Sequence, residues 1–147
     1  MPTILILDNI ADEGIRLLEA EDGFEVEVRP GLSGTELHDA LMSADGAICR
    51  SGVQIDESAL KDNRRLKVIA RAGVGTDNID KKAATRQGVV VMNTPTGNTF
   101  STAEHTFALL LGLSRNIAPA HSSLINGSWD RKGYLGNQVA DKLLGIV

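Results

Sequence analysis

The sequence predicts an α/β fold built on a doubly wound parallel sheet of five strands. Two observations lead to this fold class. Short apolar runs alternate with helical segments at about 20 to 25 residues per unit, which is typical of consecutive strand–helix units. The first run, residues 3–7, is apolar on both faces, as expected of a parallel strand covered on both sides. Right-handed crossovers then favour the flavodoxin-like strand order 2-1-3-4-5.

The first predicted helix follows this strand directly. Residues 10–20 place apolar side chains at helical spacing, and Gly23 ends the helix. Residues 24–28 alternate between apolar and polar side chains, which indicates a second strand. Pro30-Gly31 then forms a turn.

The second predicted helix begins with a capping signal. Ser33 is a favourable N-cap residue, and Glu36 stands three positions later, which is the pattern of a capping box. The helix carries Leu37, Ala40 and Leu41 on one face. We expect this face to pack on the sheet.

The rest of the sheet is predicted from shorter segments. Residues 56–60 form a short helix, and Asp80 caps another helix that continues to Thr85. The remaining strands are rich in β-branched and small residues; they span residues 47–49, 67–70 and 89–92.

The character of the chain changes after Asn98. A helix that begins at Ser101 and ends at Asn116 is apolar nearly all round, so it should be buried on most sides. One small domain cannot easily bury it, and we expect it to lie between domains or subunits. Residues 142–147 have the composition of another buried strand, inside which the chain stops.

Composition and charge exclude several classes of function. The net charge of -4 gives no general attraction to nucleic acid or to an anionic membrane. The longest apolar run, residues 107–113, is too short to span a bilayer, and no signal peptide is recognised at the N-terminus. A single cysteine, Cys49, excludes an internal disulfide; it is expected in the core and suits the cytoplasm.

Polar residues follow the predicted strands where a doubly wound sheet binds ligands, beyond the carboxyl ends of its strands. Four loops lie there: Asp8-Asn9, Arg50-Ser51-Gly52, residues 71–78 and residues 93–99. Glycine lets the backbone approach a ligand closely, and arginine forms charge-assisted hydrogen bonds to carboxylate or phosphate. The combination suggests a site for a small, doubly anionic organic acid.

Two interpretations of these loops stay open. Gly73 and Gly75 could form only a tight turn beside solvated arginines, or they could bind the anion together with Arg50 and Arg71. They do not form a dinucleotide fingerprint, because Asn78 stands where the third glycine is required.

The three histidines do not indicate a catalytic or metal site. His38 is expected to face solvent, and His105 is expected to be a structural histidine. His121 has no evident partner. No residue spacing resembles a metal site or a Ser-His-Asp arrangement.

Three motifs together resemble the D-2-hydroxyacid dehydrogenase family, most closely its D-3-phosphoglycerate dehydrogenase branch. They are R-A-G-V-G-T-D-N-I-D from Arg71, M-N-T-P-T-G-N from Met92, and S-T-A-E-H-T from Ser101. The resemblance covers essentially the whole chain.

The resemblance implies two domains and a set of ligand contacts. Residues 1–98 would be a flavodoxin-like substrate domain, and residues 99–147 a hinge and dimer helix with the first helix and strand of a truncated NAD-binding Rossmann domain. Val74 and, more weakly, Thr102 would touch the cofactor NAD. The residues implied to bind substrate are Arg50, Ser51, Arg71, Gly73, Val74, Gly75, Asn98 and Arg131.

The resemblance also implies that the catalytic residues lie outside this sequence. The family's glycine-rich cofactor loop, its catalytic histidine and glutamate, and the arginine that binds the substrate carboxyl are all absent, so we expect no catalytic residue and no bound NAD in this chain alone. The expected function is the substrate-binding portion of an NAD-dependent dehydrogenase that acts on a small phosphorylated 2-hydroxy acid. The alternative is a stand-alone anion-binding or dimerisation module without catalysis. In either case we expect a homodimer, simple or swapped, formed through the helix from Ser101 to Asn116 and the C-terminal strand.

Overall fold

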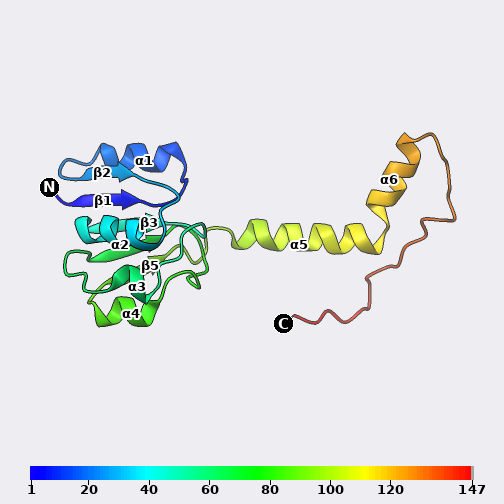
Figure 1. Ribbon diagram of the computed structural model, residues 1–147. Helices are drawn as coiled ribbons and strands as arrows, with labels where there is room; N and C mark the ends of the chain where they lie inside the picture. The colour runs from blue at the N-terminus through cyan, green and yellow to red at the C-terminus, as the bar shows by residue number, and fades with distance from the viewer. Residues whose placement is uncertain (147) are drawn as a thin grey trace. The chain divides into compact units, whose positions relative to one another are not determined.

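The computed structural model describes residues 1–146, which belong to two compact units, Met1–Asn98 and Thr99–Val147. The first unit is built on a five-stranded parallel sheet in the order β2-β1-β3-β4-β5, as predicted (Figure 1). Its strands are β1 (Thr3–Ile6), β2 (Glu25–Val28), β3 (Gly46–Cys49), β4 (Val68–Arg71) and β5 (Val90–Asn93).

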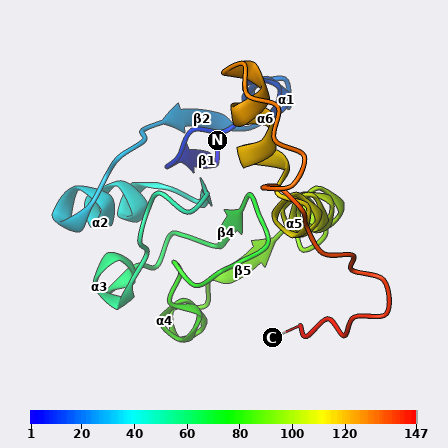
Figure 2. The same cartoon turned by 90° about the vertical axis from the view of Figure 1, so that its right-hand side faces the viewer.

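The helices of the first unit are divided unequally between the two faces of the sheet. They are α1 (Asp12–Glu19), α2 (Gly34–Ser43), α3 (Glu57–Leu60) and α4 (Lys81–Arg86). Helices α2, α3 and α4 cover one face, and α1 lies on the other (Figure 2). This division follows from right-handed crossovers, because the chain reverses direction across the sheet only once, after β2.

The core lies between the sheet and helices α2 to α4. Leu37, Ala40 and Leu41 of α2 are buried there, as predicted, together with Cys49 of β3. Burying a leucine side chain fully contributes about 1.5–3 kcal/mol, so these contacts stabilise the unit strongly. No residue of α1 is buried, and β5 exposes most of its side chains. Two-sided burial therefore does not extend to the edge strand.

Helix starts show where local signals succeed and where one fails. Asp56 and Asp80 cap α3 and α4, each through a hydrogen bond of 2.9 Å from a backbone N–H. The capping box predicted at Ser33 is wrong, because its side chain makes no capping bond. The next residue, Gly34, has a φ of 54°, a left-handed conformation that changes the course of the first turn.

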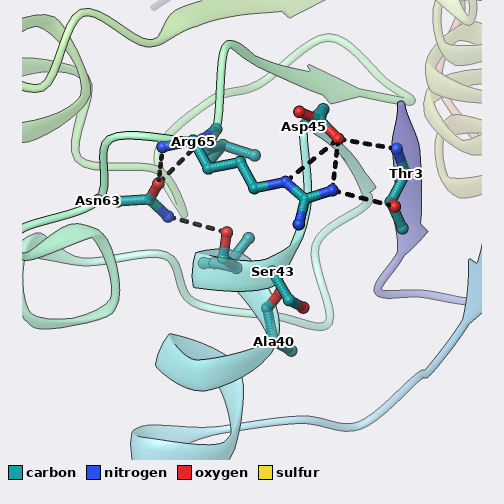
Figure 3. Close-up of polar contacts among 8 residues, drawn as sticks. Thr3, Ala40, Ser43, Asp45, Asn63 and Arg65 are labelled. Atoms are coloured by element: carbon teal, nitrogen blue, oxygen red, sulfur yellow. Dashed lines mark hydrogen bonds and ion pairs between the residues drawn. The ribbon is translucent and has the colours of Figure 1, made fainter. Parts of the chain in front are cut away.

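The amino edge of the sheet is closed by a polar network (Figure 3). The Asp45 carboxylate accepts hydrogen bonds from the Thr3 backbone N–H at 2.9 Å and from Arg65 at 2.9 and 3.3 Å. The buried Asn63 side chain donates to the Leu41 carbonyl at 2.9 Å and accepts from two backbone N–H groups. The network ties the first residue of β1 to the segments that precede β3 and β4.

The second unit contains α5 (Thr99–Ser114) and α6 (Ile117–Ile125), with Asn116 in a left-handed conformation between them. The predicted burial of the apolar helix is not provided by the described residues, since no side chain of α5 is buried. The strand predicted from Lys142 is also absent from the described residues, because a strand requires a neighbour to pair with and residues 142–146 have none. Val147 lies outside the described residues. Nowhere in residues 1–146 is there a helix of the length and apolar character needed to cross a bilayer.

Candidate functional site

The register of the sheet brings the loops after β3, β4 and β5 into one row. Cys49 of β3 is level with Arg71 of β4, and Arg71 is level with Asn93 of β5. Arg50 and Arg71 therefore emerge from neighbouring strands at the carboxyl edge, as predicted. The first unit thus brings together Arg50, Ser51, Arg71, Gly73, Val74 and Gly75, whose loops lie along this edge.

The loop that carries Arg50 is held by side chains from two other loops. The Arg50 N–H donates to a carboxylate oxygen of Asp8 at 2.6 Å. The Asn78 side chain donates to the carbonyls of Arg50 and Val53, at 2.7 and 2.8 Å. The Arg50 guanidinium is exposed and donates to the Asn9 carbonyl at 3.3 Å. Ser51 is exposed and makes no hydrogen bond within the described part of the chain.

Asn78 is the residue whose role the sequence did not reveal. In the sequence, Asn78 is distinguished only by standing where the third glycine of a nucleotide fingerprint would be. In the structure it is 7% exposed, and its amide nitrogen serves as a double donor. The only signal in the sequence is an amide side chain in the loop that follows Gly75. The fold alone shows which carbonyls this side chain reaches.

Arg71 lies across Gly73. A β-carbon at position 73 would collide with the Arg71 guanidinium, so only glycine leaves room for that side chain. The φ of Gly73 is 153°, a conformation that side-chain-bearing residues rarely adopt. The Nε of Arg71 is buried and has no hydrogen-bond partner among the described residues. A buried, unpartnered guanidinium nitrogen is costly unless an acceptor joins it.

The glycine loop is joined to the loop after β5. The Thr94 N–H donates to the Gly73 carbonyl at 3.0 Å, and the Asn93 side chain donates to the Val74 carbonyl at 2.7 Å. Val74 is exposed at the tip of the loop. Asn98, the last residue of the first unit, is also exposed.

The charges at this edge favour an anion. Within residues 1–146, no carboxylate forms an ion pair with Arg50 or Arg71. The nearby Asp8 carboxylate is engaged by the Arg50 backbone N–H. Two unpaired guanidinium groups on neighbouring strands can hold two anionic groups of one small molecule.

The surface of the first unit is hollowed next to this edge. A polar hollow of about 320 Å³ lies beside it in the first unit, bordered by Gly52, Val53 and Ser33. Neither arginine lines this hollow.

Cys49 lies in the core, as predicted. It is fully buried directly before Arg50. Burial, with a contribution from the Asp8 charge, raises the pKa of its thiol to about 11. Arg71 and Asn78 oppose this shift. The thiol therefore stays protonated at neutral pH.

Two of the three histidines, His38 and His105, differ from the sequence predictions. The prediction that His38 faces solvent is wrong, because its ring is half-buried with Nδ1 3.3 Å from the Ala59 carbonyl. His105 is exposed on α5 and its ring makes no hydrogen bond to another described residue, so the expected structural role is not seen. His121 is exposed on α6.

Thr102 and Arg131 belong to the second unit. Thr102 is exposed on α5, where its carbonyl accepts a hydrogen bond from the Thr106 hydroxyl at 2.7 Å. Arg131 is exposed and borders a hollow of about 250 Å³ together with His121, Trp129 and Tyr134.

Known relatives share both the sequence and the fold. The chain is 42% identical, over all its 147 residues, to D-3-phosphoglycerate dehydrogenase of Synechocystis sp., and 43% identical to the enzyme of the same name from Methanocaldococcus jannaschii. It spans 26% and 28% of the lengths of these two relatives. Among solved structures, it is similar to the NAD+-bound 3-phosphoglycerate dehydrogenase of Entamoeba histolytica. That match has a TM-score of 0.68 and 32% identity, and it covers 78% of this chain and 39% of the other.

The same relationship appears at the level of the protein family. Residues 4–139 match the family described as D-isomer specific 2-hydroxyacid dehydrogenase, catalytic domain. The match includes the whole sheet except Thr3 of β1, and it includes both arginines of the carboxyl edge. The chain therefore belongs to the D-isomer specific 2-hydroxyacid dehydrogenase family.

Proposed function

We propose that this chain is the substrate-binding portion of an NAD-dependent D-3-phosphoglycerate dehydrogenase. The whole enzyme would oxidise 3-phosphoglycerate to 3-phosphohydroxypyruvate in the cytoplasm, on the phosphorylated route to serine. The observation that carries the proposal is that the guanidinium groups of Arg50 and Arg71, beside the glycine loop, form no ion pair within residues 1–146. The substrate has two anionic groups, a phosphate and a carboxylate, which this pair is suited to hold.

The roles of single residues follow from this proposal. Arg50, Ser51, Arg71 and Asn98 would hold the phosphate and carboxylate, and the backbone N–H groups of Gly73 to Gly75 would approach the carboxylate. Arg131 would reach the active site of a neighbouring subunit. Val74 and, more weakly, Thr102 would contact the nicotinamide cofactor.

The described residues do not provide a nucleotide-binding loop. Asn78 stands where the fingerprint needs glycine, and its side chain is already used to hold the Arg50 loop. NAD would supply a hydride acceptor when bound to the whole enzyme. The contribution of this chain is to bind the substrate and orient its C2 atom toward that acceptor.

Calorimetric titration with 3-phosphoglycerate tests the proposal. We expect a dissociation constant in the millimolar range or tighter, and its loss in Arg50→Ala. Arg65→Ala is the matched control, because it removes an arginine that is paired at the opposite edge of the sheet. Glycerate, which lacks the phosphate, should bind roughly 10-fold more weakly or worse. Absence of heat with 3-phosphoglycerate would refute the proposal.

A second measurement separates binding from turnover. Addition of NAD and 3-phosphoglycerate to this chain alone should produce no NADH. Appearance of NADH would show that the chain carries catalytic groups that we have not assigned. If 3-phosphoglycerate neither binds nor reacts, the alternative of a purely structural or dimerisation module is favoured.

The second unit supports a further proposal about assembly. Helix α5 exposes Phe107, Leu109, Leu111 and Leu113, and a helix with this composition is normally covered. We infer that the chain forms a homodimer through this helix, either simple or swapped. Light scattering should give twice the monomer mass, and Leu109→Glu should give the monomer mass. A wild-type monomer at high concentration would contradict dimerisation.

A further inference from the structure

Both backbone groups of Arg50 are held by side chains rather than by the sheet. The last rungs of the parallel ladder beside it end at Ile48 and Cys49, whose carbonyls accept from Leu7 and Ala72, both at 2.8 Å. Beyond that point, Asp8 accepts from the Arg50 N–H and Asn78 donates to the Arg50 carbonyl. The direction in which Arg50 leaves the sheet is therefore set by two side chains from other loops.

The Asp8 contact extends to the next turn of the same loop. A β-carbon on Gly52 would collide with an oxygen of the Asp8 carboxylate, so the loop is shaped closely around this group. Asn78 holds the far end of the loop at Val53 as well as its start at Arg50. Together the two side chains fix residues 50–53 at three backbone points.

Asp8 is a negative charge at an edge that should attract anions. By Coulomb's law alone, a carboxylate near Arg50 weakens the binding of an anionic ligand. Its presence there needs another explanation, and the geometry supplies one. Its oxygen is the acceptor for the Arg50 N–H at 2.6 Å.

We propose that Asp8 and Asn78 are positioning residues that aim the Arg50 guanidinium at the bound anion. This inference rests on the proposed function, because Arg50 is taken as the group that contacts the substrate. In this proposal, Asp8 and Asn78 themselves do not contact the substrate. They act through the backbone on either side of Arg50.

The acceptor role and a purely electrostatic role of Asp8 predict opposite results. Asp8→Asn keeps an oxygen acceptor and removes the charge, so it should bind 3-phosphoglycerate at least as tightly as the wild type. Asp8→Ala removes the charge and the acceptor, so it should bind roughly 10-fold more weakly. Alanine and asparagine variants that bind equally tightly would overturn the proposal.

Asn78→Ala tests the other side of the loop. It removes both donors without adding charge, and we expect a similar, roughly 10-fold weakening. Asp45→Ala is the matched control, since Asp45 accepts a backbone N–H at the opposite edge. It should leave the dissociation constant unchanged. Unchanged binding in Asn78→Ala would overturn its part of the proposal.

Amide hydrogen exchange at Arg50 distinguishes failure of this inference from failure of the proposed function. Without ligand, the Arg50 N–H should be protected in the wild type and in Asp8→Asn, and should exchange faster in Asp8→Ala. If the wild type binds no 3-phosphoglycerate, the proposed function fails. The exchange rates of the Arg50 N–H then still test whether Asp8 holds the Arg50 backbone in place. Equal protection in all three proteins would overturn that positioning role. The same spectra report whether each variant is folded.

Discussion

At both edges of the sheet, an aspartate carboxylate accepts a hydrogen bond from a distant backbone N–H, but the two edges differ in how their arginines are used. At the amino edge, Asp45 accepts the backbone N–H of Thr3, and at the carboxyl edge, Asp8 accepts that of Arg50. The amino edge also pairs its arginine, because the Arg65 guanidinium donates to Asp45 at 2.9 Å. The carboxyl edge leaves Arg50 and Arg71 without a carboxylate among the described residues.

This difference separates a stabilising network from a binding site. In Figure 3 the donors and acceptors around Asp45 and Asn63 are directed at one another, so little is left for a ligand. At the carboxyl edge the side chains hold the backbone in place and leave the guanidinium groups available. An exposed ion pair contributes little to the free energy of folding. Leaving Arg50 and Arg71 without a carboxylate partner therefore costs little stability and keeps both guanidinium groups available for a ligand.

The largest effect is expected when the unpaired arginine of β4 is removed. Arg71→Ala should weaken 3-phosphoglycerate binding about 10- to 100-fold, because a charge-assisted contact to a carboxylate or phosphate is lost. Arg65→Ala should leave the dissociation constant unchanged. Calorimetry on both variants checks the comparison, and equal losses in the two would show that the edges do not differ in this way.

A smaller effect is expected at Gly73. Gly73→Ala places a β-carbon on the Arg71 guanidinium and should weaken binding roughly 5- to 10-fold, since Arg71 must move. Gly88→Ala is a matched control, because Gly88 also has a positive φ, 72°, but nothing lies within 4 Å of its added carbon. Both variants should be destabilised by about 1 kcal/mol, as measured by urea unfolding. If Gly88→Ala also weakened binding, general strain and not the Arg71 contact would be responsible.

The reactivity of the Cys49 thiol reports whether reagents reach the core beneath the carboxyl edge. Its pKa of about 11 lies above the ordinary thiol value of 9.0, so the thiol should react slowly with iodoacetamide at pH 8 in the native protein and quickly in urea. Because the folded-state pKa is raised, stability present below pH 9 should fall as the pH rises toward 11. Cys49→Ser should lose this alkaline dependence. Rapid native alkylation would mean that the carboxyl edge opens into the core.

The smallest effect concerns acid stability at the amino edge. The hydrogen bond from Arg65, followed by that from the Thr3 N–H, lowers the pKa of Asp45 from its ordinary value of 3.8. A lowered folded-state pKa means that the stabilisation is present above pH 3.8 and is lost as the pH falls through the folded value. Urea unfolding below pH 5 should therefore be less steeply pH-dependent in Asp45→Asn than in the wild type. Parallel pH profiles would contradict the role assigned to this network.

Much of the first unit was predictable because its signals are local or periodic. The strand order followed from strand–helix alternation and crossover handedness, and the buried face of α2 followed from helical spacing. Asp80 was predicted as a cap because its partner lies only three residues away. The cap at Ser33 failed because the left-handed Gly34 follows it.

The remaining errors share one physical cause. His38 was expected in solvent, but it contacts α3, which lies 21 residues further along the chain. The expected strand at residues 142–146 needed a partner strand, and the second unit contains none among the described residues. Helix α5 is rich in apolar side chains, but none of them is buried by the described residues. Each outcome depends on contacts that local sequence does not encode.

The sequence by itself determined the parallel sheet, its strand order and the presence of two arginines and two glycines at one edge, since these follow from periodicity and from where strands end. Only the tertiary structure decided which arginines are paired, where Arg71 lies, and that Asp8 and Asn78 hold the Arg50 loop. The physical reason is separation along the chain. The Asp8 and Asn78 contacts join residues 42 and 28 positions apart, and only the folded sheet brings such groups within hydrogen-bond distance.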